Sequence, residues 1–503
     1  MTIKGAANMG DANRPNILWI CSDSQRWDSL GCYGNPWVRT PNLDRLAAGG
    51  TLFNRAYCQN PLCTPSRGSF LTGRYPVTTK LRQNGQDIPE GEVLVTRILR
   101  DNGYVCGLSG KLHLSACDHK IKNFGRDPKG WWKQQNQEYH FKGVERRIDD
   151  GYDEFYWCHS VSNSNAYTRW LQDKGSAKPE PKLRDDSRHV YRSVPDGDHV
   201  TTFCVEKAMG FLEAYKDSVY PWLFSVNIWD PHLSLRVIDE YMDRYLDRVD
   251  EIPDAVFAQG ELATKPPYQL KYHEEMKPGF DFADMTAHER KYCKAAYWAM
   301  VDHIDHQVGR LLDKLEETGQ REDTLVIYTS DHGEMLGDHG LYVKGPFHYE
   351  GAVRVPLIMS YPGVIPAGVR REALVELCDL APTVLDCAGL PRHPGMQARS
   401  LWEFVTDAAA EDAFRDDVYC EYYNANPNEP KQFCTMVRGE RYKINVFHGQ
   451  ELGELYDLEE DPGELTNLWD RPDHLGVKAA MLKRVCDRMA QTADPLPERV
   501  GIF

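Results

Sequence analysis

The chain has 503 residues, of which 41% are hydrophobic and 27% charged, and its net charge is −16. The length predicts two to four domains, or one large α/β domain with an appendage. The composition is typical of a globular protein with a sizeable core. The acidic excess argues against binding to nucleic acid or to an anionic membrane, because no surplus of Lys and Arg is left for phosphates.

No apolar run is long enough to span a bilayer, and the first residues, MTIKGAANMGDANRPN, lack the apolar segment of a secretory signal. The fourteen cysteines have no paired spacing and are too few for a disulfide scaffold. We therefore expect a cytoplasmic protein.

Four apolar runs end in polar residues, and we expect each to be a buried strand. The runs are NILWI from Asn16, YVCGLSG from Tyr104, WLFSVNIW from Trp222 and TLVIYTS from Thr324. They lead to Asp23, to Lys111 and His113, to Asp230 and His232, and to Asp331 and His332. Helical patterns lie between the runs, from Asn42, from Val93, and from His288 to Gly319. This alternation predicts a mostly parallel sheet whose carboxyl edge gathers the polar residues.

Two stretches interrupt the pattern, at residues 118–200 and 230–285, and we interpret them as insertions that wall a pocket and set specificity. After about residue 390 short strands and turns follow one another. We expect a catalytic α/β domain over residues 12–390 and an antiparallel α+β subdomain over residues 391–503.

The most specific segment is Cys63-Thr64-Pro65-Ser66-Arg67, followed by a small-residue helix that ends in Leu71-Thr72-Gly73. Pro65 and Ser66 favour a helix start, so Cys63 is expected at a helix N-terminus, where free N–H groups stabilise an anion. Two mechanisms are compatible with this position: a thiolate nucleophile of lowered pKa, or an oxidised cysteine whose hydrated aldehyde supplies a hydroxyl.

The Cys-x-Pro-Ser-Arg segment resembles the signature of type I sulfatases, in the alkaline phosphatase superfamily. The similarity extends to SLGCYGNPWVRTPNLDRLAAGG, DLAPTVLDCAGLP and ELYDLEEDPGE. It implies that Cys63 is converted to formylglycine by a formylglycine-generating enzyme. It also implies an in-line attack on sulfur by the hydrate hydroxyl, a sulfated enzyme, and loss of sulfate by C–O cleavage. The implied substrate is a small anionic sulfate ester.

The resemblance also implies a metal site of Asp23, Ser24, Asp331 and His332 with the modified Cys63. Oxygen ligands suit Ca²⁺, which is the expected ion, and the histidine makes Mn²⁺ the alternative. The family commonly has a second Asp, or a Gln, where this chain has Ser24. That departure leaves the metal and its coordination number open.

A basic group completes the implied site. Lys111 and His113 match the family's GKxH motif, His232 its PH motif, and Lys344 the lysine before the YE…RVP segment. By the resemblance, Lys111 and Lys344 hold the sulfate oxygens, His232 donates to the leaving oxygen and His113 helps to deprotonate the hydrate. Arg67 stabilises the modified Cys63.

Alternatives remain. A phosphonate monoester or phosphodiester hydrolase shares the fold and formylglycine, and TGRYPVTTKLRQNG with Asn84 resembles that branch, whereas Lys111 and His113 favour sulfate. A promiscuous enzyme could act on both. A non-catalytic sulfate or glycan binder is a third reading, against which the completeness of the motifs argues.

Other residues carry weaker expectations. Aromatic residues between 118 and 200 could stack on a substrate, although core packing is the commoner role: Trp131, Trp132, Tyr139, Tyr152, Tyr156 and Trp157. A second anionic group of the substrate could be bound by Arg146, Arg147 and Arg236, although a solvated surface position is the commoner role for arginine. His339 and His348 are interpreted as loop histidines without a role. The apolar end of DPLPERVGIF leaves a homo-oligomer open.

Overall fold

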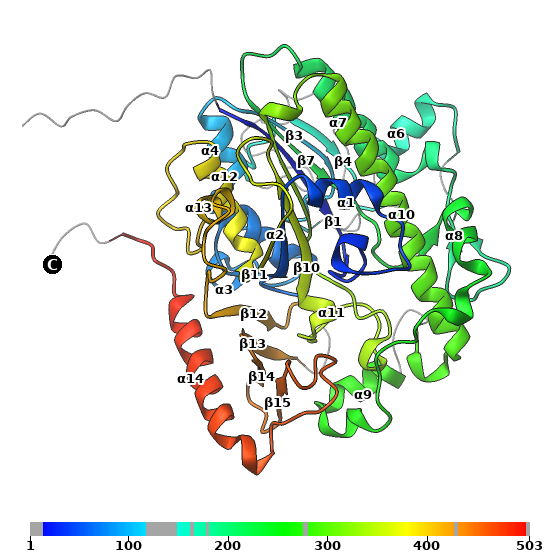
Figure 1. Cartoon of the computed structure of the whole chain (residues 1–503), viewed down its shortest axis with the longest axis vertical. Coiled ribbons are helices and arrows are strands. Elements are labelled where there is room, and N and C mark those ends of the chain that lie inside the picture. Colours follow the sequence, from blue (N-terminus) through cyan, green and yellow to red (C-terminus); the bar gives the residue numbers. More distant parts are fainter. Residues whose placement is uncertain are drawn as a thin grey trace, which may run out of the picture.

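The computed structural model describes residues 14–116, 148–160, 165–177, 180, 182–274, 280–426 and 431–498. Its centre is an eight-stranded, mostly parallel sheet with strand order β11-β2-β10-β9-β1-β7-β3-β4 (Figure 1). The strands are β1 Asn16–Ser22, β2 Thr51–Tyr57, β3 Val105–Gly110, β4 Glu154–Trp157, β7 Trp222–Asn227, β9 Thr324–Ser330, β10 Arg354–Ser360 and β11 Val369–Glu376. Only β10 runs antiparallel to its neighbours. The predicted fold class is confirmed.

The four predicted strands, β9, β1, β7 and β3, are direct neighbours and run parallel. Ser22 lies opposite Ser330, and Cys21 lies opposite Asn227, which also faces Gly110. The polar residues that follow these strands are therefore delivered to one edge of the sheet, as the sequence predicts.

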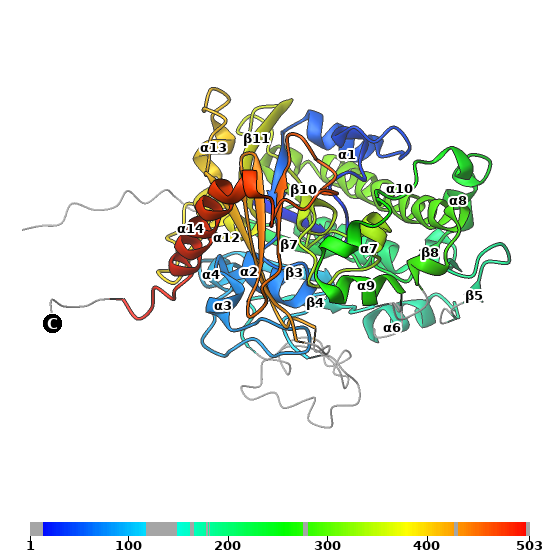
Figure 2. The same cartoon turned by 90° about the horizontal axis from the view of Figure 1, so that it is seen from below.

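Helices cover both faces of the sheet. The helices described before the second sheet are α1 Pro41–Ala48, α2 Cys63–Thr72, α3 Pro76–Thr79, α4 Val95–Asp101, α6 Asn165–Asp173, α7 Val200–Tyr215, α8 Asp239–Leu246, α9 Pro267–Glu274, α10 Ala287–Glu317, α11 Glu350–Val353, α12 Leu380–Cys387 and α13 Trp402–Thr406. Alternate residues of β1 face opposite layers: Trp19 packs with α2, α4 and α12, and Leu18 packs with α1, α7 and α10. Figure 2 shows the two helix layers on either side of the strands.

The long helix α10 matches its predicted range closely. It begins with a capping box between Thr286 and Glu289 and ends at Glu317, with Thr318 as C-cap before Gly319 in the left-handed conformation. Its buried stripe packs on α7 and α8.

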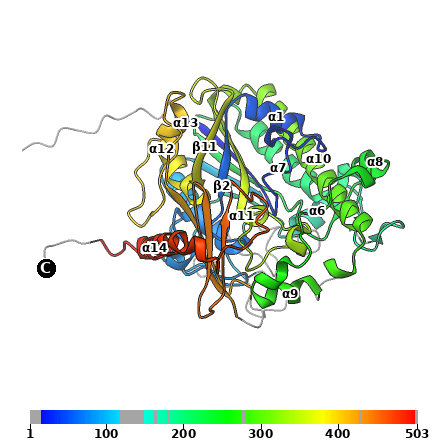
Figure 3. The ribbon, with the colours of Figure 1, turned by 60° about the horizontal axis from the view of Figure 1, so that its bottom comes forward.

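The end of the chain forms a second, antiparallel sheet of order β12-β13-β14-β15, as expected from its short strands. Its strands are β12 Asp417–Tyr423, β13 Phe433–Gly439, β14 Tyr442–Phe447 and β15 Gly453–Asp457, and α14 (Leu475–Gln491) lies along it (Figure 3). Arg488 of α14 reaches Glu376, at the end of β11, with a distance of 2.7 Å between Nη2 and Oε1. The exact boundary between the two domains, set at residue 390, stays a prediction.

Residues 118–200 are not only an insertion. β4 pairs with β3 as the last strand of the main sheet, and β5 (Lys182–Leu183) and β6 (Tyr191–Arg192) form a small sheet with β8 (Arg236–Val237). β4 was not expected from the sequence, because the short, half-buried EFYW segment has no strand signal of its own. That this stretch walls the pocket and sets specificity stays a prediction.

Several of the weaker expectations lie on these segments. Tyr152 is fully buried and bonds Ser225, so it packs in the core. Arg236 bonds Ser234 on the small sheet. Trp131, Trp132, Tyr139, Arg146, Arg147 and the last residues of the chain lie outside the described residues.

Candidate active site

Cys63 is the first residue of α2, and the helix is buried along its whole length. Leu62, in extended conformation, precedes it, and Gly73, with φ of 68°, ends the helix. The thiol lies 3.2 Å from His332 Nε2 and 3.8 Å from Asp23 Oδ1. The predicted helix start is confirmed, and it brings Cys63 to the carboxyl edge of the main sheet.

The acidic residues at this edge are held by Arg67, one turn along α2. Its guanidinium donates to Asp331 Oδ2 at 2.9 Å and to the carbonyl of Lys111 at 2.8 Å, and it lies 3.4 Å from Asp23 Oδ2. Arg67 and both aspartates are fully buried. Arg67 therefore connects residues that directly follow β1, β3 and β9.

Two lysines, Lys111 and Lys344, lie next to Asp23. Lys111 Nζ pairs with Asp23 Oδ2 at 2.5 Å, and Lys344 Nζ lies 2.9 Å from Ser24 Oγ and 3.9 Å from Asp23 Oδ1. Burial alone would raise the pKa of Asp23, but Lys111 and other cations nearby hold that pKa well below its usual range. Asp23 is therefore ionised throughout the neutral range.

Cys63 and His332 shift each other's pKa values. Burial and Asp23 raise the pKa of the thiol, but Lys111, Lys344 and His332 outweigh them, and the pKa of Cys63 is lowered. Burial lowers the pKa of His332, whereas Asp331 and Cys63 raise it to about 9. In the unmodified chain both shifts favour a thiolate next to a protonated imidazole.

Asp23, Cys63, Asp331 and His332 present ligand atoms that all lie within 4.8 Å of one another. Carboxylate and imidazole donors in a buried group suit a divalent cation. Ser24, with φ of 63°, donates from Oγ to Asp23 at 3.0 Å and accepts from Lys344. The neighbouring Gln25 accepts from Ser22 Oγ and from the Tyr328 hydroxyl, so its side chain is engaged elsewhere.

Of the two predicted catalytic histidines near Lys111, His113 is buried and His232 is half-buried. Burial, reinforced by Lys111, holds the pKa of His113 well below its ordinary value. Burial and Lys344 do the same for the pKa of His232. Both imidazoles are therefore neutral in the substrate-free protein and able to accept a proton.

Two neighbours of the residues around Cys63, Trp229 and His159, were not identified from the sequence, and neither was the contact that a third residue, Asn84, makes with α2. Asn84 Oδ1 accepts from the Thr64 N–H at 3.0 Å, at the first turn of α2. Trp229 lies beside Lys111 and His232, and the ring of His159 meets that of His113 at 4.5 Å between centroids. The run WLFSVNIW predicts a strand through Trp229, but β7 ends at Asn227, which frees Trp229 to lie at the edge.

His339 and His348 are not members of the group. His339 stacks on Tyr349 at 3.8 Å and approaches Glu261 Oε1 at 3.1 Å. Among the described residues, both ring nitrogens of the buried His348 are without a hydrogen-bond partner. The structure gives neither of them a role at the candidate site.

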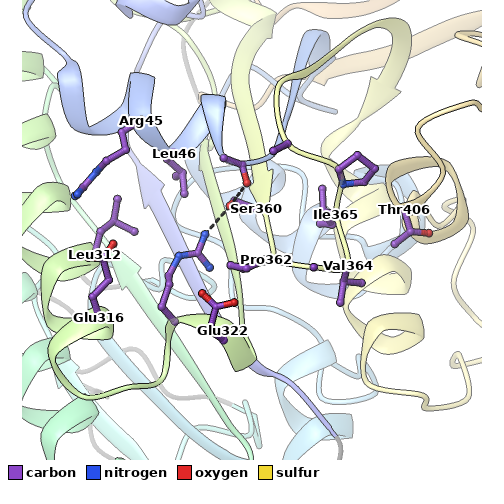
Figure 4. Close-up of a pocket in the computed structure, with 15 residues that line it drawn as sticks. Arg45, Leu46, Leu312, Glu316, Glu322, Ser360, Pro362, Val364, Ile365 and Thr406 are labelled. Atoms are coloured by element: carbon purple, nitrogen blue, oxygen red, sulfur yellow. Dashed lines mark hydrogen bonds between the residues drawn. The ribbon is translucent and has the colours of Figure 1, made fainter.

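A separate surface pocket lies at the opposite edge of the sheet (Figure 4). It is lined by the loop before β9 and the loop after β10, and Arg321 there bonds Ser360. None of the candidate residues lines it. The pocket is thus distinct from the charged group around Cys63.

Comparison with known proteins decides the family. A model of the sulfatase family matches residues 15–390, and a model described as N-sulphoglucosamine sulphohydrolase, C-terminal, matches residues 337–491. The chain belongs to the sulfatase family. It is accordingly a sulfuric ester hydrolase, and the resemblance seen in the sequence is confirmed.

Relatives cover nearly the whole sulfatase chain. An uncharacterized sulfatase, YidJ, of Escherichia coli is 28% identical over 489 residues, 96% of this chain and 88% of that protein. An N-acetylglucosamine-6-O-sulfatase of Bacteroides thetaiotaomicron is 26% identical over 521 residues, 97% and 88% of the two chains. The crystal structure of a phosphonate monoester hydrolase of Agrobacterium radiobacter superposes with a TM-score of 0.80 and 25% identity, covering 96% of this chain and 97% of that one.

Within the described part of the chain, no helix of this sulfatase is long and apolar enough to cross a membrane. The thirteen cysteines described are all free. The cytoplasmic location stays a prediction.

Proposed function

We propose that this sulfatase hydrolyses sulfate monoesters with a formylglycine formed from Cys63. The observation that supports this most is the position of Cys63. It lies at the start of α2, within 4.8 Å of the Asp23, Asp331 and His332 ligand atoms, and Lys111 and Lys344 pair with the adjacent Asp23. Such a site offers one nucleophile position and a preorganised cluster of cations for a sulfuryl group.

Two groups that the unmodified chain does not contain, formylglycine and a divalent cation, would supply the chemistry. Formylglycine at position 63 supplies a hydrate hydroxyl as nucleophile. A divalent cation held by Asp23, Asp331 and His332 would lower the pKa of that hydroxyl and polarise a sulfuryl oxygen. Ca²⁺ remains the expected ion and Mn²⁺ the alternative, and Ser24, bonded to Lys344 and Asp23, contributes at most one weak ligand.

The protein's own residues bind the ester and move protons. Lys111 and Lys344 hold the sulfuryl oxygens, and Arg67 fixes Asp23 and Asp331. His113, neutral because of burial and Lys111, takes a proton from the hydrate, since its low pKa keeps it an acceptor. His232 binds a proton when the anionic ester enters and donates it to the leaving oxygen.

Hydrolysis of phosphonate monoesters is the second candidate. The fold match to phosphonate monoester hydrolases and the presence of Asn84 at the start of α2 favour it. Lys111 and His113, which match the GKxH motif of the sulfatases and lie close to the residues around Cys63, favour sulfate. A cation cluster attracts singly charged sulfate and phosphonate monoesters alike, so we expect side activity on the second substrate.

The test compares kcat/KM for an aryl sulfate and the matching aryl phosphonate monoester. The enzyme is made together with a formylglycine-generating enzyme, and Cys63→Ala serves as the control. A sulfate preference that disappears in Cys63→Ala supports the proposal. A phosphonate preference assigns the second function, and activity that survives in Cys63→Ala contradicts both.

A further inference from the structure

Trp229 contacts two of the groups that the proposed function places on the substrate. The Lys111 ammonium lies 4.7 Å from the centroid of the Trp229 ring, and the His232 ring packs against that ring at 4.2 Å and 31°. Lys111 is 1% exposed, and a cation–π contact shielded from water is stronger than one at an exposed surface. One indole therefore limits the positions of two side chains at once.

The side chains of His232 and Lys111 each have one anchor besides Trp229. The Nδ1 of His232 lies against the backbone carbonyl of Leu233, and because a carbonyl only accepts, Nδ1 carries the hydrogen. Nε2 is then the atom left for the reaction. The carbonyl sets the rotation of the ring and Trp229 covers one of its faces, and Lys111 has its second anchor in Asp23.

A similar arrangement holds His113. The ring of His159 meets it edge to face at 4.5 Å, and His159 in turn packs against Trp229 at 5.9 Å and Trp157 at 6.3 Å between centroids. The aromatic residues that follow β4 and β7 thus pack against both histidines and against Lys111. Trp229 is the member that contacts two groups directly.

We propose that Trp229 is a positioning residue of the hydrolysis, which aligns His232 Nε2 with the leaving oxygen and keeps Lys111 in the cation cluster. The proposal rests on the proposed function. A proton donor matters most when the leaving alcohol is a poor one, because a stable phenolate leaves without help. Loss of Trp229 should therefore act selectively on esters of weakly acidic alcohols.

The test uses a series of aryl sulfates whose leaving phenols have increasing pKa. We expect Trp229→Leu to lower kcat/KM by roughly tenfold to a hundredfold for the poorest leaving group and by less than about threefold for the best. Trp229→Phe keeps an aromatic face and should recover most of the loss. Trp37→Leu is the matched control, because Trp37 stacks on Trp298 at 6.2 Å, outside the candidate group.

An equal loss across the series, or a phenylalanine variant no better than leucine, would overturn the role toward His232. A second measurement does not need turnover: calorimetric titration of the metal-loaded protein with inorganic sulfate. We expect Trp229→Leu to bind sulfate roughly three- to tenfold more weakly, as Lys111 loses one of its two contacts, and unchanged affinity would overturn the role toward Lys111. A wild-type enzyme that binds sulfate normally and turns over no ester would instead contradict the proposed function.

Discussion

The amide oxygen of Asn84 accepts a hydrogen bond from the backbone N–H of Thr64 at 3.0 Å. α2 has no cap from its own N-cap residue, Leu62, so a residue from the loop after α3 performs this task from outside the helix. The loop is itself fixed by the second sheet, since Asn84 donates from its backbone N–H to the carbonyl of Ala425 at 3.0 Å. The position of Cys63 thus depends on residues beyond β12.

Removal of this cap should loosen the start of α2. For Asn84→Ala we expect a loss of about 1 kcal/mol in the free energy of unfolding, the usual cost of a lost N-cap, and a lower kcat/KM. Asn84→Asp keeps an acceptor and should retain the stability. Urea unfolding and steady-state kinetics on the three proteins check this, and an alanine variant equal to the wild type in both would contradict the capping role.

Arg67 should not tolerate even a conservative change. Lysine cannot reproduce three contacts that diverge from one guanidinium, and the buried Oδ2 of Asp331 would lose the donor that Arg67 provides. We expect Arg67→Lys to cost about 3–5 kcal/mol in stability, as for a broken buried ion pair, together with most of the activity. Arg310→Lys, on the partly exposed face of α10, is the control and should change stability by less than about 0.5 kcal/mol.

Glu421 on β12 makes the stability of the protein depend on pH. Its carboxylate is buried, accepts from Val77 N–H and the Tyr419 hydroxyl, and burial raises its pKa to about 7 from 4.5. A carboxyl group with a raised pKa in the folded state stabilises the fold fully below pH 4.5, and this contribution is lost as the pH rises through 7.

Glu421→Gln removes this titration. Relative to the wild type, the glutamine variant should gain about 2–3 kcal/mol in the free energy of unfolding between pH 5 and pH 8. Urea unfolding of both proteins at the two pH values measures the difference. A stability difference that is the same at both would show that Glu421 is not protonated in the folded protein.

Metal removal should lower both activity and thermal stability. A cation that binds only the folded state adds about 2.7 kcal/mol at a hundred times its Kd, so chelation should lower the Tm by several degrees. Readdition of Ca²⁺ or Mn²⁺ in a thermal shift series identifies the preferred ion. Asp331→Asn, which weakens one ligand, should give a smaller shift, and equal shifts in the variant and the wild type would place the ion elsewhere.

The sequence was most informative where local rules act alone. Apolar runs that end in polar residues identified β1, β3, β7 and β9, and Pro65 identified the start of α2. The contacts of Trp229 and Asn84 could not be predicted in this way, because each is made with residues far away in the chain. β4 was missed because a four-residue edge strand with three half-buried residues has no clear alternation.

Cys63 is 1% exposed, and Asp331 and His332, which help to enclose it, come from the far half of the chain. If Cys63 is converted to formylglycine, as we propose, the thiol is accessible to the converting enzyme before β9 has joined the sheet and enclosed after it. Maturation and folding then compete in time: a chain that closes too early keeps its cysteine out of reach. The activity of a preparation would record the fraction of chains modified before that moment, so slower folding should give a more active enzyme.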